Sequence, residues 1–369
     1  MIVAELCGAI RDWDALVNNA QQHFIAGLVF NHLKTPAGER IPVEALKKLK
    51  KYSLMQAGQY LRITAAQRDL SENILRRFDI AHIFVKGSAL AAEYYIQPAM
   101  RPARDVDVLI PRSEILRFWE IAQSLGYRRL PKPDSSEQIP VKEAVWFFPV
   151  IDLVAPTGTI IEVHSALDKS EKIFDTNAVI DRANSLATDA GEISVADIHD
   201  HFLFVCLHHS RHLFSHLHWL TDLDAIMTHH RFSLDEALSR AKETNILSTV
   251  EACIDLRNAC AITPVSLDSC KTRGGRELMS WCLKSLREGV NAERATRQSR
   301  KSPDFALDWQ FGIKHRLQIL GGRLKPTFAD YQQFPLPRRW WWIYYLIRPL
   351  RLTKELLRAT WANLKKLKG

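Results

Sequence analysis

The chain has 369 residues, of which 47% are hydrophobic and 25% are charged. This length allows a catalytic domain with helical additions, and the composition is that of a globular protein rather than a disordered or fibrous one. The formal net charge of +9 is uneven, because the last 32 residues carry nine Lys or Arg and one acid, Glu355. The rest of the chain is close to neutral, so charge does not favour a nucleic-acid partner.

The six cysteines form no CxxC pair, which predicts buried free thiols in a reducing cytoplasm. The opening segment MIVAELCGAIRDWD has acids too early for a secretory signal. Apolar runs stay shorter than the ~18 residues that a membrane span needs. We therefore expect a cytoplasmic protein.

Helical spacing of apolar residues predicts helices over 1–33 and over 43–77, joined by the turn-rich segment 35–44. At Ile80 the pattern changes. A short strand is predicted over 82–86 (HIFVK), followed by Gly87-Ser88 and a helix (LAAEYY).

The next predicted strand is DVDVLI, over 105–110, and Pro111 ends it. Ser113 is predicted to cap the following helix, which Gly126 closes. The segments 145–156 and 159–167 are predicted as a hairpin turning at Thr157-Gly158. A small mixed α/β unit thus spans about 80–167.

The later part of the chain is predicted to be helical over 197–230, 234–260, 276–290 and 305–320. We divide the chain into an N-terminal helical region, a catalytic core, a helical domain and a basic aromatic C-terminal helix. Their ranges are 1–78, 79–190, 191–325 and 326–369.

Asp105 and Asp107 are the strongest candidates for chemistry. Residues two apart on a strand share a face, so these carboxylates project together while Val106 and Val108 face the opposite layer. Oxygen ligands of this kind suit Mg²⁺, and paired ions ~3.5–4 Å apart serve phosphoryl transfer. Glu162, on the strand IIEVH, is the candidate third carboxylate.

A phosphate-binding turn is predicted at Gly87-Ser88. Backbone N–H groups at a helix start can face phosphate oxygens, and the Ser88 hydroxyl can donate to them. Lys86, Arg101 and Arg104 could supply positive charge against a triphosphate. Alone, an Asp-x-Asp pair is usually a solvated surface feature. The ordered set of turn, acidic pair and acidic strand favours a metal site.

These segments resemble the uncharacterised nucleotidyltransferase family of the polymerase-β-like superfamily. The resemblance is carried by FVKGSALAAEYYIQPAMRPARDVDVLI, by IEVHSAL and by LHHSRHLFSHLHWLTDLDAI, with weaker likeness in HFIAGLVFNHL and YYLIRPLR. It implies an α+β fold: a small mixed-sheet nucleotidyltransferase core with helical regions on both sides in sequence.

The resemblance also implies functional residues. Glu162 would be the third metal ligand with His164 as its neighbour, and the later motif points at His208, Arg211 or His212, Trp219 and Asp222. Sixteen residues separate Gly87-Ser88 from the acidic pair, more than the superfamily usually has. The family often has Asp at the position of Glu162, which leaves Asp152 as the alternative third ligand.

His208, His212 and His216 are four residues apart, so they lie near one face of a helix. A zinc site is conceivable, but no HExxH motif or cysteine pair supports it. A polar face bordering the cleft is the simpler interpretation, and the resemblance favours nucleotide contacts for His208 and His212.

The C-terminal segment contains eight consecutive large apolar residues, Trp340 to Ile347, among Arg and Lys. Either its aromatic side chains dock on the helical domain, or the segment lies on a membrane surface as a peripheral contact.

We expect a metal-dependent nucleotidyltransferase that moves a nucleoside monophosphate from an NTP, ATP or CTP, to an acceptor hydroxyl on a small molecule or protein, with two Mg²⁺ or Mn²⁺ ions. Asp105, Asp107 and Glu162 would hold the metal, and Lys86, Gly87, Ser88, Arg101, Arg104, His208 and His212 the nucleotide. The alternative is a catalytically silent module that binds nucleotide or a partner on the same fold.

Overall fold

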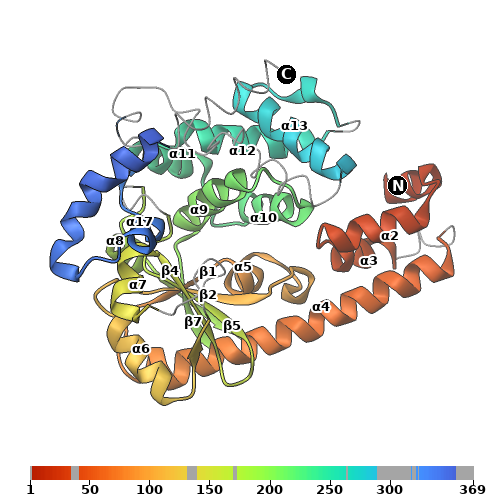
Figure 1. Cartoon of the computed structure of the whole chain (residues 1–369). Coiled ribbons are helices and arrows are strands. Elements are labelled where there is room, and N and C mark those ends of the chain that lie inside the picture. The colour runs from red at the N-terminus through yellow and green to blue at the C-terminus, as the bar shows by residue number, and fades with distance from the viewer. Residues whose placement is uncertain are drawn as a thin grey trace, which may run out of the picture.

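The centre of the molecule is a mixed sheet. The computed structural model describes residues 2–34, 41–130, 139–168, 173–262, 265–288 and 324–354, with 317 and 321–322. Within these residues seven strands lie in the order β3-β4-β5-β2-β1-β7-β6 (Figure 1). They are β1 (Ile83–Val85), β2 (Asp105–Leu109), β3 (Arg128–Arg129), β4 (Val150–Val154), β5 (Ile160–His164), β6 (Asn184–Thr188) and β7 (Gly191–Val195).

Strand β2 pairs in parallel with β5, and β1 pairs in parallel with β7, whereas the other neighbours are antiparallel. Helices cover both faces of the sheet (Figure 1). The predicted α+β class and mixed sheet are therefore confirmed.

One face of the sheet is covered by the long helix α4 (Val43–Leu70) and by α6 (Ile115–Ser124) (Figure 1). The second half of α4 buries Ile63 and Leu70 against apolar residues of β1 and β2, and a π-helical turn, η2 (Ser71–Leu75), continues it. Its first half packs on the N-terminal helices, which are α1 (Ile2–Ala9), α2 (Trp13–Gln22) and α3 (Ala26–Leu33). The helices predicted over 1–33 and 43–77 are confirmed.

The other face carries the helical layer. Its members are α9 (Ile198–Arg211), α10 (Leu217–Met227), α11 (Leu234–Glu243), α12 (Leu247–Cys260) and α13 (Arg273–Glu288). They share one core with Ile83, Val85 and Leu109 of the sheet. Each of the predicted helical segments 197–230 and 234–260 contains two helices, and 305–320 lies outside the described residues except for 317.

Two local predictions are wrong. Residues 145–147 belong to the helix α7 (Val141–Phe147), which begins after Pro140, so the strand predicted over 145–156 starts only at β4. Helix α6 has Glu114 at its N-cap without a side-chain cap, so Ser113 does not cap it. Gly126 does follow α6, with φ of +87° that suits glycine. The sheet also extends to Val195, beyond the predicted unit of 80–167.

Shorter elements complete the described chain. They are α5 (Gly87–Tyr94), η3 (Pro98–Met100), α8 (Thr176–Asp181), η4 (Leu267–Ser269), α17 (Phe328–Gln333) and η5 (Arg338–Ile343), followed by helical residues 344–354. Trp341 and Tyr344 dock beside α7, whereas Trp340 and Trp342 are exposed. Among the described residues no helix is long and apolar enough to cross a membrane. Residues 355–369 of the predicted C-terminal helix lie outside them.

Candidate functional site

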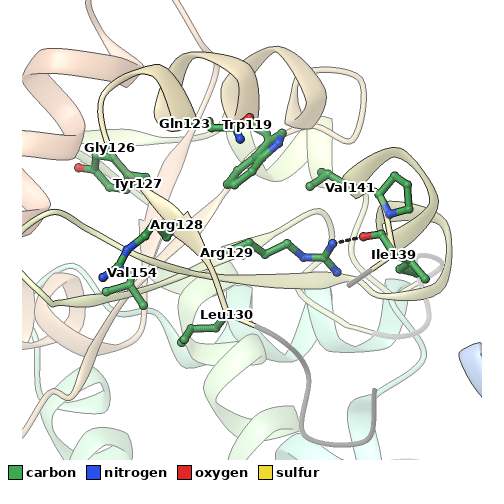
Figure 2. Close-up of a pocket in the computed structure, with 11 residues that line it drawn as sticks. Trp119, Gln123, Gly126, Tyr127, Arg128, Arg129, Leu130, Ile139, Val141 and Val154 are labelled. Carbon is green, nitrogen blue, oxygen red and sulfur yellow. Dashed lines mark hydrogen bonds between the residues drawn. The ribbon is translucent and has the colours of Figure 1, made fainter. Parts of the chain in front are cut away.

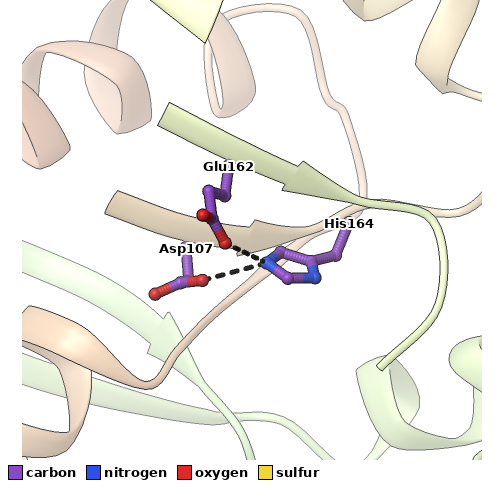
Figure 3. A group of neighbouring side chains, drawn as sticks. All are labelled: Asp107, Glu162 and His164. Carbon is purple, nitrogen blue, oxygen red and sulfur yellow. Dashed lines mark hydrogen bonds and ion pairs between the residues drawn. The ribbon is translucent and has the colours of Figure 1, made fainter. Parts of the chain in front are cut away.

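The acidic residues meet where β2 and β5 run side by side. The parallel register pairs Asp107 with Glu162, which puts both side chains on the face toward the helical layer. His164 lies two residues after Glu162 on that face, and its Nε2 is 2.9 Å from Asp107 Oδ1 and 3.5 Å from Glu162 Oε2 (Figure 3). Among the described residues these three side chains form the one group whose ligand atoms lie close enough to share a metal ion.

Asp105 lies on the same face, one step back along β2. Burial raises its pKa to about 6, and the negative charges of Asp107 and Glu162 add to the effect. The alternative ligand Asp152 pairs with Glu162 from β4, but it is not part of the metal-sized group. The alternation predicted for both strands is confirmed, because Val106, Val108, Ile161 and Val163 belong to the core on the α4 side.

Lys86 provides the cation that these carboxylates require. Its Nζ is 2.5 Å from Asp107 Oδ1 and 3.6 Å from Glu162 Oε2. Burial alone would raise the pKa of Asp107, but the Lys86 ammonium and the His164 ring hold that pKa well below its usual range. Burial alone would lower the pKa of Lys86, and the two carboxylates raise it instead. The site is thus a buried anionic centre with an ammonium of the chain as counter-ion.

The turn that carries Lys86 is strained and tightly packed. Lys86 has φ 49° and ψ −147°, a conformation that is rare for a residue with a side chain, and Gly87 has φ +28°. A Cβ at Gly87 would lie 3.2 Å from the Asp105 carbonyl oxygen and 3.6 Å from Asp107 Oδ2. Glycine therefore allows the start of α5 to approach the carboxylates directly.

The oxygen donors of Asp105, Asp107 and Glu162 fit Mg²⁺ or Mn²⁺, which prefer carboxylate oxygens. The Lys86 ammonium already shows that a cation is accommodated between Asp107 and Glu162.

Comparison with known families decides what kind of protein carries this centre. The family described as uncharacterised nucleotidyltransferases matches residues 10–261. The chain belongs to this family. The match includes α2 and α3, the whole sheet, and α9 to α12. Membership in this family indicates a transferase that acts on nucleotides.

Among solved structures, a crystal structure of an antigenic nucleotidyltransferase-like protein from Paracoccidioides brasiliensis is similar to part of the chain. The two are 12% identical, the TM-score is 0.32, and the similarity covers 53% of this chain and 93% of the other. The search among curated proteins found no match.

Two residues predicted to bind nucleotide are engaged elsewhere in this structure. The Ser88 hydroxyl is buried and donates to Gln67 Oε1 of α4. Arg101 is buried beside α10, where its Nε and Nη2 lie 3.1 and 2.9 Å from the two carboxylate oxygens of Asp222. Arg104, in contrast, is exposed and stacks on the Phe24 ring, and its positive charge opposes part of the rise in the pKa of Asp105.

His208 lies in the last turn of α9, close enough to Lys86 and His164 to feel their charges, and His212 is the C-cap residue of that helix. His216 precedes α10, so the prediction that the three histidines share one helix face is wrong. The His208 and His212 rings are 4.7 Å apart, and the Trp219 ring is 5.1 Å from His212. Burial, and then the Lys86 charge, lower the pKa of His208 well below its usual value, so the ring is neutral. His208, His212 and His216 are not a metal-sized group among the described residues. Arg211 pairs with Asp168.

A buried network that sequence reasoning missed holds the turn from the helical layer. His201 of α9 accepts the backbone N–H of Lys86 at 3.3 Å, with Glu93 on the other side of its ring. Arg101 donates to the Gly87 carbonyl at 3.2 Å while Asp222 holds its guanidinium. The family resemblance pointed to Asp222. No sequence pattern pointed to His201, because its role depends on a contact with Lys86 across 115 residues of sequence.

A cavity of about 880 Å³ lies elsewhere, at the β3 edge of the sheet. Trp119, Tyr127, Arg128 and Arg129 line it (Figure 2). Its lining does not include the acidic group, and we assign it no role.

Proposed function

We propose that this protein transfers a nucleoside monophosphate from an NTP to an acceptor hydroxyl and releases pyrophosphate. The observation that carries the proposal is the cluster of Asp107, Glu162 and His164 beside the Gly87 turn, in a chain that belongs to a nucleotidyltransferase family. Asp105 lies outside this metal-sized group, but it is near enough for the charges of Asp107 and Glu162 to raise its pKa. The acceptor oxygen forms a bond to the α-phosphorus, and the bond from that phosphorus to the bridging oxygen of the β-phosphate breaks.

Asp105, Asp107 and Glu162 would hold the divalent ions. When bound, two Mg²⁺ or Mn²⁺ ions supply the positive charge that neutralises the triphosphate and the developing charge on the oxygens. Glu162 is 31% exposed at its side chain, the most open of the metal-sized group, which suits it to take the acceptor proton. Its place in that group supports Glu162 over Asp152 as the third carboxylate.

Positive charge from the chain would bind the triphosphate. Lys86, once the carboxylates bind another cation, can turn its ammonium toward phosphate oxygens. The N–H groups in the first turn of α5 would face phosphate oxygens, and the exposed Arg104, near enough to act on the pKa of Asp105, would add a second positive charge. His208 and His212 would contact the nucleotide as hydrogen-bonding or stacking groups, and the low pKa of His208 keeps it neutral there.

The test is metal-dependent release of pyrophosphate by purified full-length protein, with each NTP in turn and with hydroxyl acceptors that include the protein itself. We expect turnover with ATP or CTP, and a loss of about 100-fold or more in Asp107→Asn. Asp152→Asn is the matched control, because this carboxylate lies in the same row of the sheet outside the metal-sized group.

Equal rates in wild type and Asp107→Asn would contradict transfer at this site. Calorimetry with Mg²⁺ and a nucleotide separates the alternative function. Tight nucleotide binding by a wild-type protein that releases no pyrophosphate would identify a silent binding module instead.

A further inference from the structure

The C-terminal part of the described chain docks through aromatic side chains. Trp341 and Tyr344 are 5% and 0% exposed. The Trp341 ring lies 4.9 Å from Trp146 and 5.1 Å from Phe147 of α7, and the Tyr344 hydroxyl donates to the Phe334 carbonyl at 2.6 Å. These contacts fix the rotation of the helix that follows.

The two arginines of this helix, Arg348 and Arg351, face inward. Arg351 Nε is 2.7 Å from Asp330 Oδ1, and Arg348 Nη1 is 3.9 Å from Asp330 Oδ2. Asp330 of α17 is fully buried. Positions 341, 344, 348 and 351 follow helical spacing, so the docked face combines two aromatic residues with two ion-paired arginines.

The opposite face is apolar and exposed. Trp342, Leu346 and Leu350, spaced four residues apart, are 57, 61 and 73% exposed, and Tyr345 beside them is 54% exposed. A surface helix of a globular protein normally turns its apolar side inward. Here a second apolar row remains on the outside, opposite the docked face, and Figure 1 shows this helix in blue on the outer left edge of the molecule, away from the sheet.

The charges around this face select its partner. Arg338 and Arg339 are exposed at one end, where the Arg339 guanidinium lies 5.9 Å from the Trp340 ring, and Lys354 is exposed at the other end. Residues 334–354 contain no Asp or Glu. Tryptophan, tyrosine and cationic side chains together suit the boundary between lipid headgroups and acyl chains.

We propose that this face, made of Trp340, Trp342, Tyr345, Leu346 and Leu350 with Arg338, Arg339 and Lys354, rests on an anionic lipid bilayer. A second copy of the chain fits less well, because symmetric contact would bring the same cations together, and residues 334–354 contain no acid to oppose them. The proposal stands independently of nucleotidyl transfer.

Co-sedimentation of the full-length protein with vesicles tests this surface. Wild type is expected to bind vesicles that contain phosphatidylglycerol, to bind pure phosphatidylcholine more weakly, and to lose affinity as salt is raised. The variant Trp342→Gln/Leu346→Gln/Leu350→Gln should lose about tenfold or more in affinity, because it removes the apolar part of the face.

The matched control is Leu54→Gln/Met55→Gln/Leu61→Gln on α4, whose side chains are 63, 60 and 67% exposed. It should bind vesicles as wild type does. Both variants must keep the wild-type melting temperature. We expect this because the altered side chains are exposed and contribute little to the core. The proposal is overturned by absent vesicle binding, by equal losses in the two variants, or by a lipid-free dimer that only the C-terminal variant disrupts.

Discussion

The ion pair between Arg101 and Asp222 is the contact through which the helical layer holds the catalytic turn, and Asp222→Asn probes it. The carboxylate is fully buried and receives Tyr95 Oη–H at 2.7 Å, His209 Nε2 at 3.1 Å and two nitrogens of Arg101. Asparagine keeps the shape of the side chain but removes its charge. The Arg101 guanidinium would then be buried without a counter-ion.

Breaking a buried pair in this way costs about 3–5 kcal/mol. Since whole domains have unfolding free energies of about 5–15 kcal/mol, the loss is a large share of the total. For 369 residues that unfold together, at about 2.1 cal/mol/K of unfolding entropy per residue, it corresponds to a fall in melting temperature of roughly 4–6 °C. Without Asp222 to hold it, the Arg101 guanidinium no longer donates to the Gly87 carbonyl from a fixed position. The turn that would bind the triphosphate is then less well held, so the affinity for nucleotide should weaken even in protein that is still folded.

Urea unfolding followed by circular dichroism measures the first effect, and calorimetric titration with nucleotide at low temperature measures the second. Asp14→Asn, which removes an exposed pair with Lys48, is the control and should leave the midpoint unchanged. Replacing both members, as Arg101→Met/Asp222→Leu, should restore much of the lost stability but not the nucleotide affinity. A midpoint for Asp222→Asn equal to that of the control would refute this reasoning.

Three further predictions follow from the same contacts. Lys86→Met should bind Mn²⁺ several-fold more tightly than wild type in calorimetry without nucleotide, because it removes the ammonium that competes for Asp107; unchanged or weaker binding would contradict this. Ser88→Ala should lower the unfolding free energy by about 1 kcal/mol without changing nucleotide affinity, since the hydroxyl serves Gln67; weaker nucleotide binding at unchanged stability would favour a phosphate contact instead. Burial lowers the pKa of His209 to about 4, although Asp222 opposes the shift. As pH falls, the unfolded chain therefore takes up a proton at this histidine before the folded protein does. Up to about 3 kcal/mol of the unfolding free energy should be lost between about pH 6.5 and pH 4. Urea midpoints across that range should fall less steeply in His209→Gln.

The sequence predicted the acidic face of the sheet because period-two alternation is a local signal. DVDVLI and IIEVH each place carboxylates on one side and β-branched residues on the other, and the register of β2 with β5 needed only that alternation. The glycine turn was equally local. The apolar run at 145–147 was ambiguous, because a short apolar run suits a helix or a strand, and Pro140 starts a helix there.

The partners of Arg101 and Ser88 could not be predicted in the same way. An arginine near an acidic pair suggests a phosphate ligand, yet Arg101 meets Asp222 across 121 residues of sequence, and Ser88 meets Gln67 across 21. The hairpin β6–β7 is polar and short, so its place beside β1 depends on tertiary contacts. Lys86 was predicted to face phosphate. In the structure its ammonium group instead pairs with Asp107 and neutralises part of the carboxylate charge.

A crystal soaked with Mn²⁺ and a non-hydrolysable NTP tests the central claim most directly. We predict anomalous density for Mn²⁺ among Asp105, Asp107 and Glu162, with the Lys86 ammonium moved from Asp107 to a phosphate oxygen. Nucleotide bound elsewhere, with Lys86 still paired to Asp107 and no metal density at the three carboxylates, would contradict it.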